Sequence, residues 1–464
     1  MARQCTRGRR RPLDGHGCTR ARCANGDLTT VDPARVHPDD PRHVTERGTR
    51  MLTLTGALQN YDWGSPTTIP DFLGVPPDGR PWAEVWHGAH PSHPALADSA
   101  SPADPGRPLD AVIASDPTGW LGESTIGRFG AGLPFLVKLL ATCRALSIQV
   151  HPSLEQARAG YRREQEAGVD AAHRNYSDAN HKPEAIVALS PLRALAGFRH
   201  AEDIRADLAL VPGLEGVCSV LGAAPEERAI EEAFTLLEEL PPSEVAAALE
   251  ALGSAPGTPA LDLARDLLGQ FPGDRGALVS VFLNHVTVAP GHALSTGAGT
   301  VHAYLDGFGL EVMSSSDNVL RAGLTSKRVD VAEFTANADF HPGSAPVRPL
   351  EASWPAPGVC LQELTTSVPD FRLEVVEVRE PGVVEVGGDG RVTMLLALEG
   401  AVVVADAAGR SALVPGGAVL ARAEDSVRVE GAGRVAVVTV ASAADGRGAR
   451  VLPVVATPAR VAVA

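Results

Sequence analysis

Lysine is the scarcest charged residue in this 464-residue chain. Of the 41 cationic residues, 38 are arginine, and the lysines are Lys138, Lys182 and Lys327 alone. A coding bias toward arginine with three chance survivors is the alternative explanation of the count. However, a compact ammonium and a planar guanidinium are not interchangeable where a site needs a small point charge. The three lysines are therefore candidates for a functional site.

Other features are also missing from the sequence. Cations are outnumbered by 56 acidic residues, and the resulting net charge of -15 argues against a general nucleic-acid-binding protein. No apolar run approaches the length of a membrane span. The six cysteines show neither a paired zinc spacing nor a disulfide framework. We expect a cytoplasmic protein with reduced thiols.

The first fifty residues differ from the rest of the chain. They contain eleven arginines against six acidic residues and lack the apolar stretch of a secretory signal. We predict that residues 1–50 form a disordered N-terminal extension and that the folded protein begins at Met51.

The remaining sequence predicts a mainly β protein with an inserted helical domain. Short apolar runs between Gly and Pro residues, as at 133–140 and 146–151, favour short strands over long helices in residues 51–200. Strands are predicted again at 278–283 and 286–288. We therefore assign 51–200 and 276–334 to one catalytic β domain.

Residues 201–275 are predicted to be the helical insertion. Ile230, Phe234 and Leu237 recur at helical spacing, and Ser243 is placed to cap an Ala-rich helix over 244–252. After about residue 335, alternating segments at 371–378, 392–398 and 435–440 indicate a C-terminal jelly-roll β domain over 335–464.

Several polar residues have the spacing of a metal site. In a strand, Gln149 and His151 lie on the same face, because side chains alternate with period two. Glu184 and His302 supply a carboxylate and a second imidazole. Two His and one Glu suit zinc or iron(II). From spacing alone, each His can equally be a structural hydrogen-bonding residue, and Gln is an unusual zinc ligand.

Two further segments have open interpretations. His87, His90 and His93 stand in a loop with Gly and Pro, without an acidic or Cys residue at ligand spacing, so we expect structural roles for them. The run 314–328 is either an anion-binding loop or a solvated turn in which Asp317 and Arg321 form an ion pair.

Taken together, the motifs resemble those of the type I phosphomannose isomerases, which belong to the cupin superfamily. The resemblance covers Met51 to Phe334, is weaker in the C-terminal domain and is absent from the first fifty residues. The motifs that carry it, in the family's order, are 61–65, 83–86 with 89–91, 133–138, 146–152, 180–184, 298–304 and 311–327. This resemblance implies cupin-type jelly-roll β-barrels.

The resemblance also implies site residues. The family's zinc ligands match Gln149, His151, Glu184 and His302, so Zn2+ is the expected cofactor. Arg321 matches the family's active-site arginine. The positions that match other residues of the family's pocket are Lys138, His181, Lys182, Glu311 and Asp317.

The implied reaction is the interconversion of mannose 6-phosphate and fructose 6-phosphate through an enediol. The general base stays open among His181, Lys138, Lys182, Glu311 and a zinc-bound water. The expected partner is a small-molecule sugar phosphate, with neither nucleic acid nor membrane. We expect a cytoplasmic monomer in carbohydrate metabolism, in GDP-mannose biosynthesis or in mannose breakdown.

Some positions depart from the family pattern, and two rival hypotheses stay open. Val301 and Ser326 stand where the family more often has Pro, and His87 replaces a commonly apolar residue. One rival is a non-haem iron(II) cupin oxygenase, which needs neither Gln149 nor phosphate-binding cations. The other is a non-catalytic sugar-phosphate-sensing cupin, which would tolerate loss of Arg321.

Overall fold

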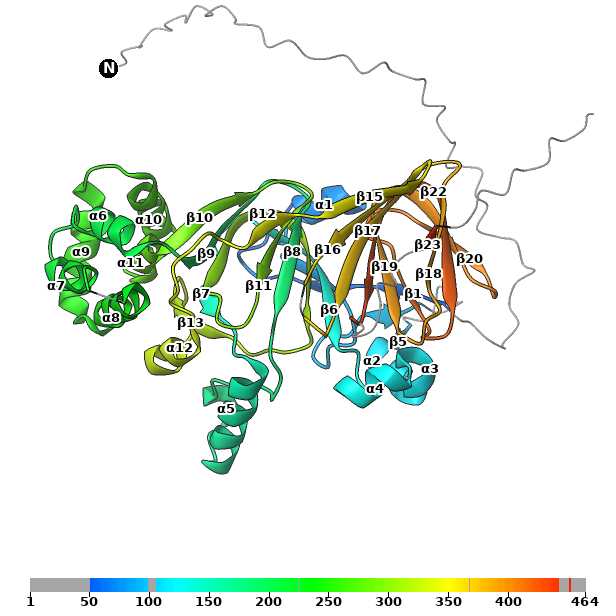
Figure 1. Ribbon diagram of the computed structural model, residues 1–464, viewed down its shortest axis with the longest axis horizontal. Coiled ribbons are helices and arrows are strands. Elements are labelled where there is room, and N and C mark those ends of the chain that lie inside the picture. Colours follow the sequence, from blue (N-terminus) through cyan, green and yellow to red (C-terminus); the bar gives the residue numbers. More distant parts are fainter. Residues whose placement is uncertain (1–50, 99–105, 224, 367, 442–449, 452–464) are drawn as a thin grey trace, which may run out of the picture. The chain divides into compact units, whose positions relative to one another are not determined.

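A computed structural model of the chain describes residues 51–98, 106–223, 225–366, 368–441 and 450–451. The extension predicted at 1–50 lies outside these residues. Figure 1 shows extended strands with helices grouped at their margins, which confirms the mainly β prediction. Within the described parts of the chain, none of the helices has the length and apolarity needed to cross a membrane.

The first of two antiparallel sheets is built largely from C-terminal strands. Its N-terminal strand β1 begins at Met51 and pairs with β21, so the sheet joins the two ends of the described chain. Along its main path the order is β15 (Glu351–Ala356), β16 (Val359–Leu364), β17 (Arg372–Val378), β22 (Ser426–Thr439), β19 (Thr393–Ala405), β21 (Ala418–Ala421), β1 (Met51–Thr55), β4 (Leu96–Ala97) and β5 (Arg107–Pro108), with β18 (Val383–Gly387), β20 (Arg410–Leu413) and β23 (Arg450–Val451) attached beside it.

The second sheet contains the strands that carry the predicted site. The long strand β12 pairs with β6 and β8 along one half and with β7 and β9 along the other. Along the main path of this sheet the order is β14 (Val347–Pro349), β11 (His292–Thr296), β8 (Glu184–Ala188), β12 (His302–Ser314), β6 (Phe135–Thr142), β3 (Glu84–His87) and β2 (Ala57–Gln59). The strands that pair off this path are β7 (Ile148–Val150), β9 (Leu192–Phe198), β10 (Leu283–Val288) and β13 (Leu320–Gly323).

Strand pairing crosses the predicted domain boundary at residue 334 in both directions. β1 joins the C-terminal strands, whereas β14 pairs with β11 of the second sheet. The domain division itself stays a prediction. A buried cluster that includes Leu54, Phe135, Leu373 and Met394 packs the inner faces of the two sheets together.

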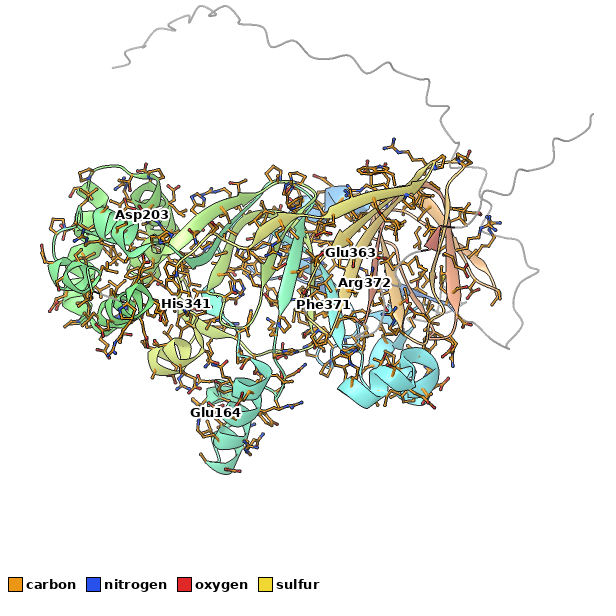
Figure 2. All side chains as sticks on the ribbon, viewed as in Figure 1. Glu164, Asp203, His341, Glu363, Phe371 and Arg372 are labelled. Atoms are coloured by element: carbon orange, nitrogen blue, oxygen red, sulfur yellow. The ribbon has the colours of Figure 1, made fainter. Side chains whose placement is uncertain are left out.

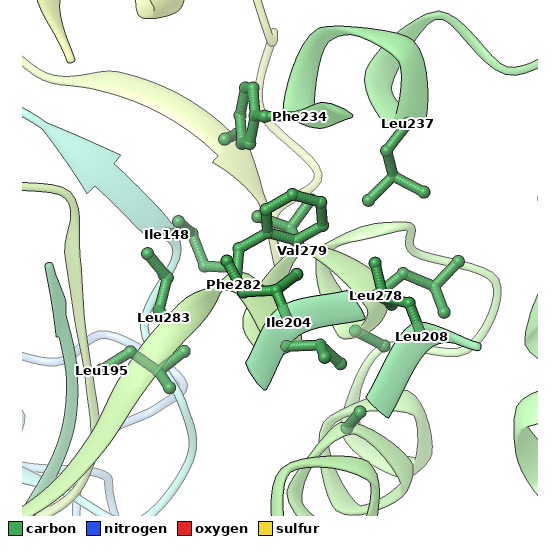
Figure 3. Close-up of a cluster of buried hydrophobic side chains, with 14 of the residues drawn as sticks. Ile148, Leu195, Ile204, Leu208, Phe234, Leu237, Leu278, Val279, Phe282 and Leu283 are labelled. Atoms are coloured by element: carbon green, nitrogen blue, oxygen red, sulfur yellow. The ribbon is translucent and has the colours of Figure 1, made fainter. Parts of the chain in front are cut away.

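The helical insertion follows β9 and returns to β10. It consists of α6 (Ala201–Leu208), α7 (Glu215–Val220), α8 (Glu226–Glu239), α9 (Pro242–Ser254) and α10 (Pro259–Gln270), followed by α11 (Gly276–Val279) and η3 (Ser280–Phe282). Ile230, Phe234 and Leu237 are buried in α8, as their spacing predicts. In Figure 3 these helices meet the sheet through Phe234, Phe282 and Leu195.

Two local predictions are wrong. The run 278–283 was expected to be a strand but is helical up to Phe282. The prediction failed because a buried apolar run has no periodicity that distinguishes a helix from a strand. α9 begins at Pro242 after Pro241, so Ser243 does not cap it, and proline suits the first turn of a helix. Residues 51–200 also contain helices: α1 (Thr68–Leu73), α2 (Leu109–Ser115), α3 (Pro117–Leu121), α4 (Glu123–Phe129) and α5 (Leu154–Glu166).

The sequence did contain a signal for α5. Ser153 and Gln156 form a reciprocal capping box at its first turn, a pattern visible as Ser-x-x-Gln. Figure 2 shows Glu164 on this helix. The Glu164 carboxylate accepts hydrogen bonds from the backbone N–H groups of Asn175 and Tyr176, which fixes the segment leading to β8.

Candidate active site

The predicted site residues gather around one cavity of about 530 Å³ beside the second sheet. Gln149 enters it from β7, Glu184 from β8, and Glu311 from β12. Its wall also includes all three lysines of the chain. The scarcity of lysine therefore did mark a single site. The predicted site residues that line the cavity are Lys138, Gln149, Lys182, Glu184, Glu311, Asp317 and Arg321.

His151, Glu184 and His302 form the only group of three potential metal-ligating side chains found among the described residues. Their ligand atoms lie within 4.8 Å of one another, and all three residues are buried. Nε2 of His151 and Nε2 of His302 are each 3.3 Å from Oε2 of Glu184.

Backbone carbonyls determine which ring nitrogens face this point. Nδ1 of His151 lies 2.7 Å from the carbonyl oxygen of Asn318, and Nδ1 of His302 lies 2.9 Å from that of Thr300. A carbonyl oxygen only accepts, so each Nδ1 carries the hydrogen. In a neutral ring, Nε2 then presents a lone pair. Burial lowers the pKa of His151 to about 4, which keeps its ring neutral near pH 7.

Two imidazole lone pairs therefore face one carboxylate oxygen. Nε2 of His151 and Oε2 of Glu184 have no hydrogen-bond partner, although both are buried. Acceptors converging without a donor repel one another, and such an arrangement is stabilised by a cation. The residues thus fit a divalent metal with nitrogen and oxygen ligands.

Gln149 is placed to join this group. It lies opposite His302 in the pairing of β7 with β12, and its Nε2 is 3.2 Å from Nε2 of His302. A half turn of the amide exchanges its nitrogen and oxygen, and their assignment follows from the hydrogen-bond partners alone. Gln149 can therefore offer a neutral oxygen ligand.

The Glu184 carboxylate also has a cationic neighbour. Nζ of Lys182 lies 3.1 Å from its other oxygen, Oε1. Burial by itself raises the pKa of Glu184, but the charge of Lys182 is the largest of the effects that oppose it, and the pKa is held well below its ordinary value. Glu184 is therefore ionised.

Lys138 lies between two buried carboxylates. Its Nζ is 3.4 Å from Oε1 of Glu84 and 3.2 Å from Oε2 of Glu311. Burial opposes the charged form, yet the two carboxylates outweigh it and raise the pKa of Lys138. Burial in turn raises the pKa of Glu311. Trp86 donates from Nε1 to Oε2 of Glu84 at 2.7 Å, which orients that carboxylate.

Arg321 and Lys327 add positive charge to the same cavity. Arg321 lies on β13, where it pairs with Gln149 of β7. Burial lowers the pKa of its guanidinium, which nonetheless stays charged. Lys327 is largely exposed, and its partial burial, followed by repulsion from Arg321 and Lys182, lowers its pKa.

The loop around Asp317 was expected to be either an anion-binding loop or a solvated turn with an ion pair between Asp317 and Arg321, and it matches neither fully. Its carboxylate lies 3.3 Å from Nε2 of His90, and no ion pair with Arg321 is found in the described part of the chain. The hydrogen bond from His90 is the main reason why the pKa of Asp317 is lowered. His90 also lines the cavity, and the structural role expected for it stays a prediction. His87 and His93 are not among the lining residues.

His181 is the one predicted pocket residue that points elsewhere. It is not among the residues lining the cavity, and its Nε2 lies 2.9 Å from the carboxylate of Asp370. Asp370 is buried and immediately precedes Phe371, labelled near the start of β17 in Figure 2. The imidazole thus connects the segment before Glu184 to the other sheet.

Other cavity residues had no role in the sequence-based prediction. Glu84 and His90 lie within motifs that carry the family resemblance, so their position was a usable signal. Tyr61 and Trp63 lie within the motif 61–65 and offered the same signal, whereas Arg144 and Phe271 lie in none of these motifs. Phe271 comes from the end of the helical insertion and stacks under Arg144 at 4.5 Å, a contact that sequence spacing does not reveal.

Comparison with known proteins agrees with this geometry. Residues 51–201 match the phosphomannose isomerase type I catalytic domain. The mannose-6-phosphate isomerase of Salmonella typhimurium is 36% identical over 83% of this chain and 98% of its own length. That of Escherichia coli is 41% identical over 62% of this chain and 75% of its own, and that of Bos taurus 31% identical over 82% and 95%.

Solved structures give the same result. A variant of phosphomannose isomerase from Salmonella typhimurium superimposes with a TM-score of 0.77 at 34% identity, covering 85% of this chain and all of that one. A zinc-bound mannose 6-phosphate isomerase reaches 0.76 at 34% identity with the same coverage. These matches confirm the cupin-type fold, and the His-Glu-His group agrees with the predicted zinc. The chain belongs to the type I phosphomannose isomerase family.

Proposed function

We propose that this chain is a zinc-dependent aldose-ketose isomerase that interconverts mannose 6-phosphate and fructose 6-phosphate. One observation carries the proposal: the unpartnered lone pairs of His151 and Glu184 lie beside a cavity lined by the three lysines and Arg321. Such a site combines a metal with cations for a dianionic substrate.

The metal would be held by Gln149, His151, Glu184 and His302. When bound, zinc supplies positive charge that stabilises negative charge developing on the substrate. A neutral Gln in place of a second carboxylate leaves more of that charge uncompensated, which favours this role.

The reaction needs a group that moves a proton between C2 and C1 of the sugar. Lys138 and Glu311 are 3.2 Å apart in the cavity, so one of them can hold the proton while the other compensates the charge. The raised pKa of Glu311 suits a carboxyl group that both takes and returns a proton. Lys182 remains a third candidate. His181 faces Asp370, so we assign it a supporting role instead.

Two cations fit the charges on the substrate. Arg321 stays protonated while a neighbouring base titrates, and it lies on the strand next to Gln149. We assign it to stabilisation of the enediolate. Lys327 is an exposed cation at the cavity wall. This position suits a residue that orients the phosphate of the substrate where the cavity opens to water.

The rival hypotheses account for less of the site. An iron(II) oxygenase leaves Gln149 and the lysines without a role. A non-catalytic sensor leaves the buried Lys138-Glu311 pair unexplained, since buried charges are costly to maintain. We further propose a cytoplasmic monomer without nucleic-acid or membrane partners, supplying mannose 6-phosphate to GDP-mannose biosynthesis.

A direct assay tests the activity. Purified, zinc-loaded protein is incubated with mannose 6-phosphate, and fructose 6-phosphate is measured by chromatography, with unphosphorylated mannose as the control substrate. We expect conversion in both directions, loss of activity on chelation and recovery on return of zinc. Absence of fructose 6-phosphate with folded, zinc-loaded protein would contradict the proposal.

A further inference from the structure

A carboxylate of the helical insertion binds the segment that carries Lys327. Asp274 lies between α10 and α11. Its Oδ1 accepts hydrogen bonds from the backbone N–H groups of Gly276 at 2.7 Å and Leu324 at 3.0 Å, and its Oδ2 accepts one from Thr325 at 3.0 Å. We call residues 324–327 the strap. Two of the three bonds therefore tie the strap to the insertion.

The strap begins with a strained backbone conformation. Leu324 has φ of 53°, and no other non-glycine residue in the described chain has a positive φ. A left-handed conformation is unfavourable for an L-residue, so it persists only where surrounding contacts hold it. The Leu324 side chain is buried, and the Asp274 carboxylate binds the N–H on either side of its Cα.

Two glycines allow the insertion and the strap to approach this closely. A Cβ on Gly276 would lie 2.5 Å from the backbone nitrogen of Leu324, and a Cβ on Gly323 would lie 2.5 Å from Cα of Gly276. Neither position has room for a side chain, and Gly323 also has φ of 148°. The contact is therefore backbone against backbone, which fixes the distance between the two segments.

The strap in turn forms part of the cavity wall. Leu324, Thr325, Ser326 and Lys327 all line it. Inside the strap, the backbone N–H of Lys327 donates to Oγ1 of Thr325 at 3.0 Å, so displacement of Thr325 is passed on to Lys327. Arg321, by contrast, is anchored by the pairing of β13 with β7. Loss of Asp274 should thus move Lys327 more than Arg321.

We propose that Asp274 is a positioning residue: its carboxylate fixes the left-handed turn at Leu324 and thereby sets where Lys327 presents its ammonium to the phosphate of the substrate. The helical insertion then contributes to substrate binding without touching the substrate through this residue. The identity of the substrate rests on the proposed function, whereas the fixing of the turn does not.

The test compares Asp274→Ala, Lys327→Ala and the double variant in steady-state kinetics with mannose 6-phosphate. Asp274→Ala should raise KM roughly 10-fold with a smaller change in kcat, because a phosphate contact acts in the ground state and transition state alike. If Asp274 acts through Lys327, the double variant should have the KM of Lys327→Ala alone. Glu238→Gln is the matched control, because Glu238 lines a neighbouring cavity with Asp274 but forms no hydrogen bond to the strap.

A second measurement does not depend on activity. In Asp274→Asn the amide keeps one acceptor oxygen, so this milder variant should fold even if Asp274→Ala does not. Hydrogen exchange at the Leu324 and Thr325 amides should become faster in this variant, and stay unchanged in Glu238→Gln. If wild-type protein lacks isomerase activity, the proposed function fails and this exchange still tests the turn.

The proposal would be overturned by any of three results. These are unchanged exchange at both strap amides in Asp274→Asn, a KM within twofold of wild type in folded Asp274→Ala, or additive effects of Asp274→Ala and Lys327→Ala on KM. Additivity would mean that Asp274 acts on the site independently of Lys327.

Discussion

His302 on β12 lies directly opposite Gln149 on β7, and the ends of their side chains approach to 3.2 Å although 153 positions separate them in sequence. Glu184 enters from β8, on the other half of β12. Both β7 and β8 pair with β12, so the ligand group is assembled from strands of one sheet that are far apart in the sequence.

Removal of either imidazole should release the metal. We expect His151→Ala and His302→Ala to bind zinc at least 10-fold to 100-fold more weakly, because each deletes one imidazole ligand from the group. Metal analysis of the folded variants after dialysis measures this. His285→Ala is the control, since that histidine is exposed on β10. Full zinc content in either site variant would exclude that residue as a ligand.

Replacement of Arg321 should slow the chemical step. If its charge stabilises the enediolate, Arg321→Ala should lower kcat roughly 100-fold or more with a smaller change in KM, and zinc content should stay the same. Arg193→Ala, which removes a partly exposed partner of Asp306, serves as the control. A steep rise in KM with little change in kcat would instead indicate phosphate binding, and unchanged constants would deny Arg321 any role.

Glu238 should make the protein less stable as pH rises. Burial raises the pKa of Glu238 to about 7 from an ordinary value of 4.5. The folded state therefore favours the protonated carboxyl, and the corresponding stability is present below pH 4.5 and lost as pH rises toward 7. A pKa shift from 4.5 to about 7 corresponds to roughly 3 kcal/mol.

Glu238→Gln should remove this loss. The melting temperature of the variant minus that of wild type should be several degrees larger at pH 8 than at pH 5. Thermal unfolding of both proteins with equal zinc content measures this difference. An equal difference at the two pH values would show that Glu238 does not change its protonation in this range.

The first fifty residues should be dispensable for the fold, whereas the next five should not. A chain beginning at Met51 retains β1, which lies between β21 and β4 in the first sheet. We expect its melting temperature and activity to match those of the full chain. A chain beginning at Gly56 loses β1 and exposes both neighbouring strands, so it should unfold several degrees lower or fail to fold. A comparable loss on starting at Met51 would contradict the prediction.

The sequence alone determined the family and predicted the chemical identity of the site. Ordered motifs predicted Gln149, His151, Glu184 and His302 as ligands, and the count of lysines pointed to the same cavity, because chemistry restricts which residue types a metal or a phosphate accepts. Helical spacing likewise predicted the buried face of α8. These are local patterns, which a sequence displays directly.

Only the tertiary structure decided which candidates face the substrate cavity. His181 stands beside Lys182, yet its ring contacts Asp370, 189 positions away, and Asp317 pairs with His90 and not with Arg321. The run 278–282 is helical and packs in a core shared with the insertion, and Asp274 accepts a hydrogen bond from Leu324 where Gly276 and Gly323 let the two segments approach. Side-chain direction and backbone approach depend on contacts between distant segments, and sequence spacing does not encode them.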